Sequence, residues 1–550
     1  MPLIDPIELL AREDKWYLGN GGLLVYAPPF PKYLRSPGFW DECHFGDLAV
    51  ERLLCVSFVG EISTAQGGTG GPPVVGAEQR SARFGSSADV PSADEDGGRD
   101  ARPTGTEATH ASPLLQAGAL TLLDLEPHLS HWRWYPDRVT ARHYLVLRDG
   151  VGYKQQRGVR IFVDETRRVG PDGTLHCDLA FDVLGGCEIT ALHVVAWTVR
   201  QNTKEAMASR FSDLKGYGSS LSYRQQVNRR AHARGKKPVE LAVTMSGTRT
   251  ADSIEVTPSH GANLVPELRY TPLWDSLKRG KLSGKVDGDN VLGSLIYAGL
   301  HWRIPVENRR AEGVGIRVKV ENAAKHDAPK ETVPAGGYHQ SLATPDPAES
   351  WREFTSLVPY FECSDPMLTR YYWYRWYGLR LNAVPPGGNY AAPAVTEGIA
   401  YFRGVITYSL MCHLNECKWL SDPALARGCL ENHLKHQARA GHLPGHIYLS
   451  YVNRKGFYHT DIGQCVADLL RHYPDAKWAK KIYRPLAKLL SYYRKDRDRE
   501  GLNLYDIRDQ YETGQEFTSR YFHADERADL YGWEHRLRLK GVDVTTYVYH

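Results

Sequence analysis

The 550-residue sequence contains no apolar run of about 18 residues, the length that a membrane-spanning helix requires. Its first residues, Met1 to Glu8, lack the basic segment followed by an apolar segment that a secretory signal would show. The nine cysteines include no C-x-x-C pair, and an odd, dispersed set is typical of reduced thiols. These absences predict a cytoplasmic protein without a membrane partner.

The excess of positive over negative charge is also small, because 68 Lys and Arg residues face 64 Asp and Glu residues and the net charge is only +4. So small an excess does not call for a nucleic-acid partner. The sequence has no nucleotide-binding P-loop and no G-x-S-x-G nucleophile elbow, and we expect no cofactor. Four histidines (His433, His436, His442 and His446) follow one another without the order of a zinc-binding motif. We therefore expect them at the surface and predict no metal site.

Phenylalanine is sparse among the aromatic residues, with 14 copies against 32 tyrosines and 13 tryptophans. Aromatic rings with a polar edge suit surfaces that stack on sugars, although they serve equally as core and interface residues. The excess of tyrosine is therefore compatible with a carbohydrate ligand without requiring one.

Residues 1–345 are predicted to form a β-sandwich domain. Short apolar segments alternate with turn residues, as in Arg142–Arg148, Val159–Val163 and Ile189–Val199, and this spacing is typical of a sandwich. Two stretches interrupt the pattern. Residues 63–112 are rich in Gly, Ser, Ala and Pro and predict a disordered insertion. Residues 202–238 are polar and basic and predict a solvated insertion.

Residues 346–550 predict a helical domain, so the expected fold class is multidomain β plus α. Ser364-Asp365-Pro366 has the pattern of an N-cap followed by proline in the first turn. The predicted helices cover residues 367–382, 397–420, 422–441, 461–472 and 475–494, and another begins near Lys540.

The strongest candidate for chemistry is the segment Tyr511–Tyr521, on a loop between helices. Glu512 and Glu516 lie four residues apart on either side of Gly514, and aromatic residues frame them. A partly desolvated carboxyl group has a raised pKa and keeps the proton that a general acid needs. The alternative is a helix N-terminus whose acidic residues complement the dipole.

Other polar residues lie at similar junctions. Glu397, Tyr401 and Arg403 follow a glycine-rich turn, where they could bind sugar hydroxyls or form a structural ion pair. His459 and Asp461 precede a predicted helix, and Asp461 is either a substrate ligand or simply an N-cap.

These motifs resemble inverting glycosidases with an (α/α)6 barrel, the six-hairpin glycosidases, notably glycoside hydrolase family 63 with its mannosylglycerate-hydrolase-like members and the family 37 trehalases. The segment Glu512–Tyr521 is similar to the family pattern E-S-G-x-D-x-S-x-R-W, with Glu516 in place of the acidic Asp and with Arg520 retained. Val542–Tyr547, which contains Asp543, resembles the pattern V-D-L-N-A-L. The family's W-x-W-D-x-F segment falls near Glu397–Arg403, where neither Trp nor Asp is preserved.

The resemblance implies an inverting glycosidase that acts on α-linked glucosides or mannosides, with Glu516 as general acid. It implies substrate contacts from Glu397, Tyr401, Arg403, His459, Asp461, Glu512, Arg520 and Asp543. Such a barrel has twelve helices, and its general base lies in the second half. We therefore expect that the chain ends within the barrel and that the base lies beyond His550.

Two other functions remain open at this point. One is a non-catalytic carbohydrate-binding or remnant protein, in which Trp373, Trp376, Trp419 and Trp533 stack on sugars or fill the core. The other is a sugar phosphorylase, which would depend on phosphate. The sequence leaves the oligomeric state open.

Overall fold

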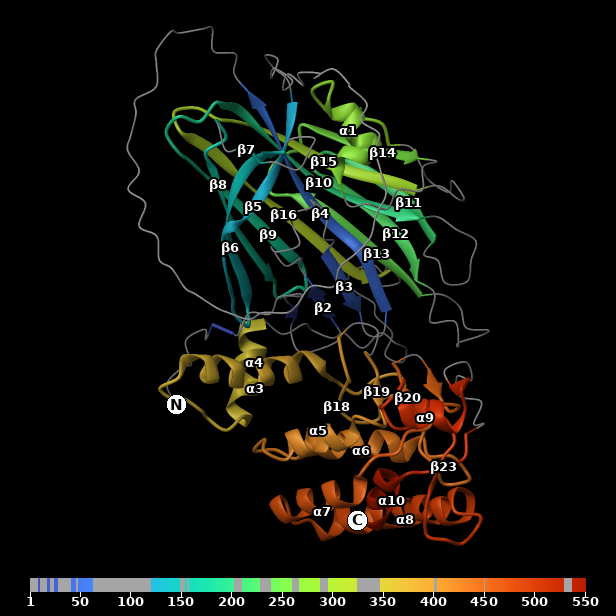
Figure 1. The fold of residues 1–550 in the computed structure, drawn as a ribbon. Coiled ribbons are helices and arrows are strands. Elements are labelled where there is room, and N and C mark those ends of the chain that lie inside the picture. Colours follow the sequence, from blue (N-terminus) through green and yellow to red (C-terminus); the bar gives the residue numbers. More distant parts are fainter. Residues whose placement is uncertain are drawn as a thin grey trace, which may run out of the picture.

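The computed structural model describes residues 8–9, 17–19, 24–27, 41–45, 48–62, 120–148, 154–155, 158–201, 210–227, 239–259, 267–286, 295–323, 347–399, 403–449, 451–528 and 537–550. Within these ranges a large sheet is followed by a helical part (Figure 1). The predicted insertion at 63–112 lies outside the described residues. Part of the predicted insertion at 202–238 is a hairpin of the sheet, because residues 210–227 form two of its strands.

The N-terminal part is a 16-stranded antiparallel sheet. Its strands are β1 (Leu18–Gly19), β2 (Leu24–Ala27), β3 (Asp41–Phe45), β4 (Leu48–Ile62), β5 (Leu120–Trp134), β6 (Arg138–Arg148), β7 (Lys154–Gln155), β8 (Ile161–Val169), β9 (Leu175–Val183), β10 (Ile189–Gln201), β11 (Arg210–Tyr217), β12 (Ser220–Val227), β13 (Val239–Gly247), β14 (Ser253–Ser259), β15 (Leu295–Pro305) and β16 (Arg310–Asn322).

The sheet curves back on itself, so that distant strands face each other across a core (Figure 1). β12 lies against β4 and β15, and β15 lies against β16, although these strands are not neighbours in the sheet order. The apolar residues of β10 and β15 are buried on both sides. One face of these two strands points into the main core, and the other is covered by the short helix α1 (Pro272–Leu277) with its buried Leu273 and Leu277.

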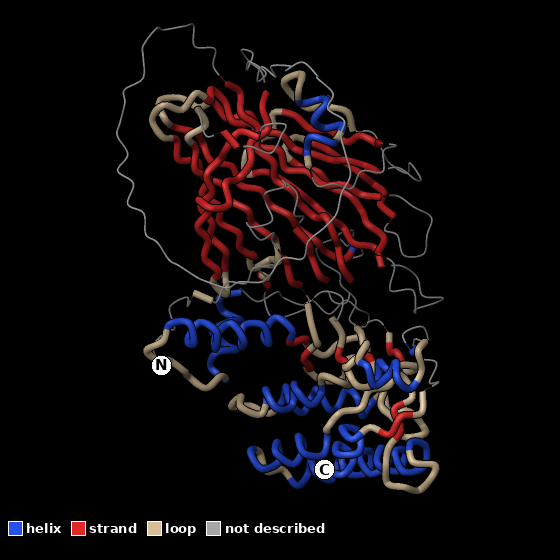
Figure 2. The backbone as a smooth tube through the Cα atoms, in the orientation of Figure 1, coloured by secondary structure: helices blue, strands red, loops and turns tan. Residues whose placement is uncertain are grey.

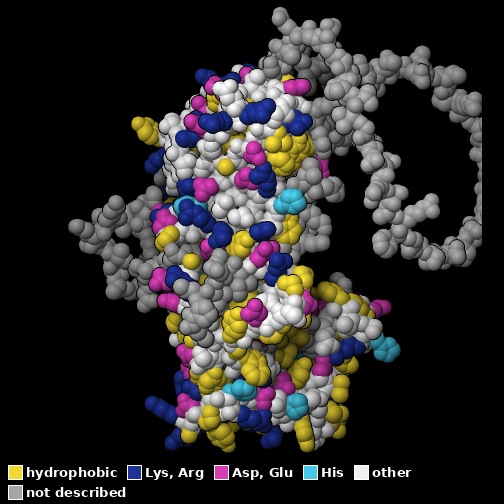
Figure 3. Space-filling model, turned by 90° about the vertical axis from the view of Figure 1, so that its left-hand side faces the viewer, with side chains coloured by type: hydrophobic (Ala, Val, Ile, Leu, Met, Phe, Trp, Pro, Cys, Tyr) yellow, Lys and Arg dark blue, Asp and Glu magenta, His cyan; other side chains and the backbone are white. Residues whose placement is uncertain are grey.

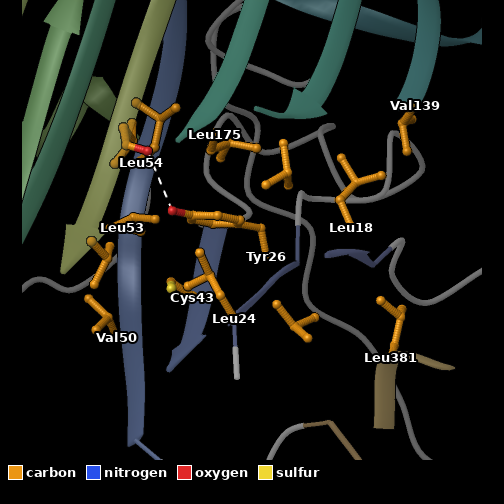
Figure 4. Packing of buried hydrophobic residues seen from close by; sticks show 14 of the residues in the cluster. Leu18, Leu24, Tyr26, Cys43, Val50, Leu53, Leu54, Val139, Leu175 and Leu381 are labelled. Atoms are coloured by element: carbon orange, nitrogen blue, oxygen red, sulfur yellow. Dashed lines mark hydrogen bonds between the residues drawn. The ribbon is translucent and has the colours of Figure 1, made fainter. Parts of the chain in front are cut away.

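A single apolar core joins the sheet to the helices. Figure 4 shows Tyr26 among Leu24, Cys43 and Leu175, with Leu381 of the helical part in the same cluster. The Tyr26 hydroxyl donates to the carbonyl of Gly173 at 2.8 Å, which satisfies its polar end inside the core.

The helical part contains α3 (Pro347–Leu357), α4 (Pro366–Asn382), α5 (Leu410–Cys417), α6 (Ala424–Lys435), α7 (Ile462–His472), α8 (Ala476–Tyr492), α9 (Ser519–Ala524) and α10 (Val542–Tyr549). Short elements between them are β17 (Ala383–Val384), β18 (Ala394–Val395), β19 (Val405–Ile406), β20 (His446–Ile447), β21 (Val452–Asn453), β22 (Asp506–Ile507) and β23 (Leu539–Lys540). Figure 2 shows this division, with the strands of the large sheet at one end of the molecule and most helices at the other.

Caps fix several helix starts at the residues that the sequence indicates. Asp365, which precedes Pro366, caps α4 by accepting a hydrogen bond from the amide of Met367. The side chain of Asp475 caps α8 in the same way by accepting from the amide of Trp478. Most of the predicted helices are present within a few residues. The predicted helix over 397–420 is wrong in its first half: among the described residues of this range only 410–417 are helical, and Val405 and Ile406 pair with β20.

Aromatic and arginine side chains connect α4 to the sheet. The rings of Trp134 and Tyr377 meet edge to face at 5.6 Å, and the Tyr377 hydroxyl donates to the carbonyl of Tyr17. The buried Arg380 guanidinium donates to the carbonyl of Gly19 at 3.1 Å. These contacts hold the first strands against the helices.

The chain therefore combines an N-terminal antiparallel β part with a C-terminal helical part, as predicted. α5 packs on α6 and α7, α6 on α8, and α7 on α10. A closed (α/α)6 toroid stays a prediction. Among the described residues, no helix has the length and apolar character needed to cross a membrane. Figure 3 shows charged side chains of both signs interspersed on the sheet part of one face, with no extended patch of either sign there.

Candidate active site

The candidate site is built on the loop between β22 and α9. Its first turn is the 3-10 helix η4 (Gln510–Glu512), capped by Asp509, whose side chain accepts the amide of Tyr511. Two residues of the loop adopt left-handed backbone conformations, Gly514 with φ 65° and Phe517 with φ 60°. Glu512 and Glu516 therefore do not share a helix face, and their side chains have separate surroundings.

Glu512 is completely buried and fully engaged with protein groups. Both of its oxygens accept hydrogen bonds from Arg497, each at 2.9 Å. Oε2 also accepts the amide of Arg508 at 2.8 Å and lies 3.2 Å from Nε2 of His459. Such a bidentate, desolvated pair has a fixed geometry. The carboxylate thus anchors the loop from inside.

His459 is likewise buried, and its surroundings assign its tautomer. An ionised carboxylate only accepts, so Nε2–H donates to Glu512, and Nδ1 accepts from the Tyr493 hydroxyl at 3.1 Å. Burial lowers the pKa of His459, and Glu512 opposes that shift. Tyr493 and Arg497 belong to η3 (Tyr493–Arg497), a π-helical turn after α8 that brings both side chains inward.

Glu516 is only partly buried and lies in the electrostatic field of Glu397. Glu397 taken as a whole residue is exposed to solvent, but neighbouring atoms exclude part of the water around its carboxyl group. This desolvation raises the pKa of Glu397; the Ser409 hydroxyl, which donates to Oε2 at 2.6 Å, lowers it, and the charge of Glu516 adds to the rise. The structure therefore brings Glu397 and Glu516 together from segments far apart in the sequence.

Tyr408 lies against Gly514 of the loop and interacts electrostatically with both Glu516 and Glu397. Burial raises the pKa of its phenol, and Tyr547, Cys412, Glu516 and Glu397 add to the rise. Its ring packs on Gly514 so closely that a Cβ atom at Gly514 would lie 2.6 Å from Cζ of Tyr408. Gly514 is required here both for its positive φ and for this close approach.

Arg520 and Asp543 form a second group at the same loop. Both terminal nitrogens of Arg520 lie 3.2 Å from Oδ2 of Asp543, and Nη2 also donates to the hydroxyls of Thr513 and Tyr521. The Nε2 group of Gln515 lies 3.4 Å from the same Asp543 oxygen. This network links the loop to α10.

The other predicted residues are placed differently. Asp461 caps α7 by accepting the amide of Gln464, and it pairs with His550 at 2.8 Å. Arg403 is buried and donates to the carbonyl of Leu381, and its charge reaches Cys43 of the sheet. Tyr401 lies outside the described residues.

The expectation of surface histidines is wrong for His433, which has no exposed surface on α6. Burial lowers the pKa of His433 to about 3, and His436 and His413 contribute. Across the described ranges, no three His, Cys, Asp or Glu side chains are placed to hold a metal ion.

Sequence reasoning missed Tyr408, Ser409, Arg497 and Gln510. Ser409 and Tyr408 lie in the stretch predicted as a continuous helix, which concealed them. Arg497 lies 15 residues before Glu512 in an unremarkable charged run, so no local pattern marks it.

One surface pocket of about 340 Å3 lies beside α10, lined by Leu504, Val542, Thr545 and Tyr549 among others. Neither Glu397 nor Glu516 contributes to it.

No protein-family model and no curated protein sequence matches the chain. Among solved structures, the chain is similar to a family GH92 α-mannosidase from Bacteroides thetaiotaomicron (TM-score 0.34, 9% identity, covering 68% of this chain and 43% of that one). It is also similar to a proposed kojibiose phosphorylase from the human microbiome (TM-score 0.41, 8% identity, covering 89% of this chain and 60% of that one). The chain spans less than two thirds of the length of either of these structures.

Proposed function

We propose that the protein is an inverting glycoside hydrolase that acts on α-linked glucosides or mannosides, with Glu516 as the general acid. The observation that carries the proposal is the contrast between the two glutamates of one loop. Glu512 is locked inside by Arg497 and His459, whereas Glu516 remains partly accessible beside Glu397. Their segment resembles the acid loop of inverting glycosidases, and this resemblance supports Glu516 as the proton donor.

In the proposed reaction, Glu516 protonates the glycosidic oxygen as the bond to the anomeric carbon breaks. Glu397 binds a sugar hydroxyl, and Tyr408 supplies an aromatic wall. Water attacks the anomeric carbon from the opposite face and gives a proton to a second carboxylate, which in inverting enzymes lies roughly 6.5–9.5 Å from the acid. Arg520 and Asp543 hold the far side of the loop through Thr513 and Gln515.

The proposal is tested with α-glucosyl and α-mannosyl fluorides and with unactivated α-linked disaccharides, and 1H NMR follows the anomer first released. We expect the full-length protein to release the inverted anomer. The Glu516→Gln substitution should slow hydrolysis of a disaccharide by roughly 10²-fold or more, because the proton donor is removed. Glu526→Gln, which changes an exposed glutamate just after α9, is the matched control.

Retention of configuration would overturn the mechanism. Turnover that requires added phosphate would replace it by a phosphorylase. Sugar binding without turnover would favour the non-catalytic alternative.

A further inference from the structure

Phe517, the residue directly after Glu516, has an unusual backbone conformation. Its φ of 60° lies in the left-handed region, which glycine adopts readily but other residues adopt at a cost in free energy. The residue is 64% exposed and its ring meets only the edge-to-face ring of Tyr511 at 6.4 Å among the ring pairs described, so burial of the ring is not what holds this conformation. A specific contact must compensate for the strain.

That contact is made by Gln510, which has no exposed surface. Its Oε1 accepts the amide N–H of Phe517 at 2.9 Å, and its Nε2 donates to the carbonyl of Ala528 at 3.0 Å. One side chain thus ties the peptide after Glu516 to the end of the segment containing α9. The backbone of Gln510 is itself fixed, because it begins the capped turn η4 that ends at the buried Glu512.

We propose that Gln510 is a positioning residue for Glu516: its side chain holds the left-handed Phe517 peptide and thereby sets the direction in which the Glu516 carboxyl group points. The inference rests on the proposed function. Proton transfer requires hydrogen-bond geometry, and a misplacement of about 1 Å costs roughly 10²-fold in rate. Without the Gln510 bond, Phe517 can return to an ordinary backbone conformation, and the adjacent Glu516 moves with it.

The test variant is Gln510→Met, which has a similar volume and removes both hydrogen bonds. Hydrolysis is compared for a disaccharide, whose leaving group needs a proton, and for the glycosyl fluoride, whose leaving group needs little assistance. We expect the disaccharide rate to fall by roughly 10²-fold and the fluoride rate to fall much less. A purely structural defect would lower both rates together.

Gln437→Met is the matched control. The Gln437 side chain likewise bonds two backbone groups, since its Nε2 donates to the carbonyls of Gly441 and Pro485 at 2.7 and 3.0 Å, but it lies between α6 and α8. This variant should lose some stability and leave the ratio of the two rates unchanged. Equal losses on both substrates in Gln510→Met, or the same ratio change in Gln437→Met, would overturn the positioning role.

Hydrogen exchange of the Phe517 amide separates this inference from the proposed function. We expect faster exchange in Gln510→Met than in the unmodified protein, whatever the substrate is. A full-length wild-type protein that hydrolyses neither substrate would refute the proposed function and the positioning role in catalysis. Unchanged exchange at Phe517 would refute the hydrogen bond itself.

Discussion

At the scale of single residues, Glu512 and Glu516 show how far sequence and structure agree. The sequence places both glutamates on a loop between helices, and the structure has them there, because two carboxylates around a glycine follow a polar, turn-rich run. Their different environments could not be predicted. The side chains that bind Glu512, those of Arg497 and His459, lie 15 and 53 residues away in the sequence, and such distant pairings leave no trace in local spacing.

The buried pair of Arg497 and Glu512 gives the first prediction on stability. Arg497→Met leaves the Glu512 charge buried without its main partner, which should cost about 3–5 kcal/mol in the free energy of unfolding. The guanidinium also lies 4.3 Å from the centre of the Phe457 ring, a contact that the variant loses as well. Urea unfolding of the variant and the parent measures the difference.

Arg499→Met is the control for this comparison. Arg499 is largely exposed and pairs only with Asp496 on its own turn among the ion pairs described, so its removal should change stability by about 0.5 kcal/mol or less. Equal effects of the two variants would mean that Arg497 does not anchor the loop.

At the scale of elements, the contact between Tyr408 and the acid loop depends on Gly514. Gly514→Ala places a methyl group within 2.6 Å of the Tyr408 ring and also strains the left-handed backbone. We expect a loss of more than about 1 kcal/mol in stability together with a loss of hydrolysis, because either the ring or the loop must move. Thermal unfolding and rate measurements on the same sample test this prediction.

Gly501→Ala separates the two causes. Gly501 has a similar φ of 70°, but a Cβ atom there meets nothing within 4 Å. It should therefore show the backbone strain alone and keep the activity. If Gly514→Ala and Gly501→Ala behave alike, the close packing on Tyr408 has no functional role.

The segment 397–417 explains why one element was mispredicted. Val405 and Ile406 belong to an apolar run that fits a buried helix or a short strand equally well. In the structure, pairing of these residues with Ile447 and His446 decides for a strand. After this strand, Tyr408 packs on Gly514 of the acid loop and Ser409 donates to Glu397, so these two residues were missed together with the strand.

At the scale of the whole molecule, the division into a β part and a helical part was predictable because it depends on periodicity and turn residues. The order of strands in the curved sheet was not, since β9 pairs with β16 across more than a hundred residues of chain. Each part also buries neutral histidines that the sequence does not distinguish from exposed ones. Burial lowers the pKa of His301 in the sheet and that of His433 in the helices, in each case to about 3.

These two histidines predict a loss of stability in weak acid. In the unfolded chain a histidine has a pKa of about 6.5, so below that pH the unfolded state binds protons that the folded state excludes. Stability is therefore complete above pH 6.5 and falls as the pH drops toward 3. At pH 5 each histidine should cost about 2 kcal/mol, which is 1.5 pH units at about 1.36 kcal/mol each. In the sheet, a hydrogen bond joins ring nitrogens of His301 and His193 at 2.8 Å. Charging both rings would therefore also create a repulsion between them.

The decisive comparison is the unfolding midpoint between pH 7.5 and 5 for the parent and for His433→Leu. In the folded protein, neither ring nitrogen of His433 has a hydrogen-bond partner among the described residues. A leucine of similar size should therefore be tolerated at pH 7.5 and, because unpartnered buried nitrogens are costly, should stabilise the helical part by about 1 kcal/mol. At pH 5 the gain should grow by about 2 kcal/mol, since leucine takes up no proton in the unfolded state.

Buried carboxylates such as Glu165, whose pKa Arg167 and His143 lower despite the opposing effect of burial, lose their stabilising contribution only below about pH 4.5, outside this window. Parallel pH profiles for the parent and His433→Leu would contradict this prediction, because they would mean that His433 is protonated in the folded protein as readily as in the unfolded chain.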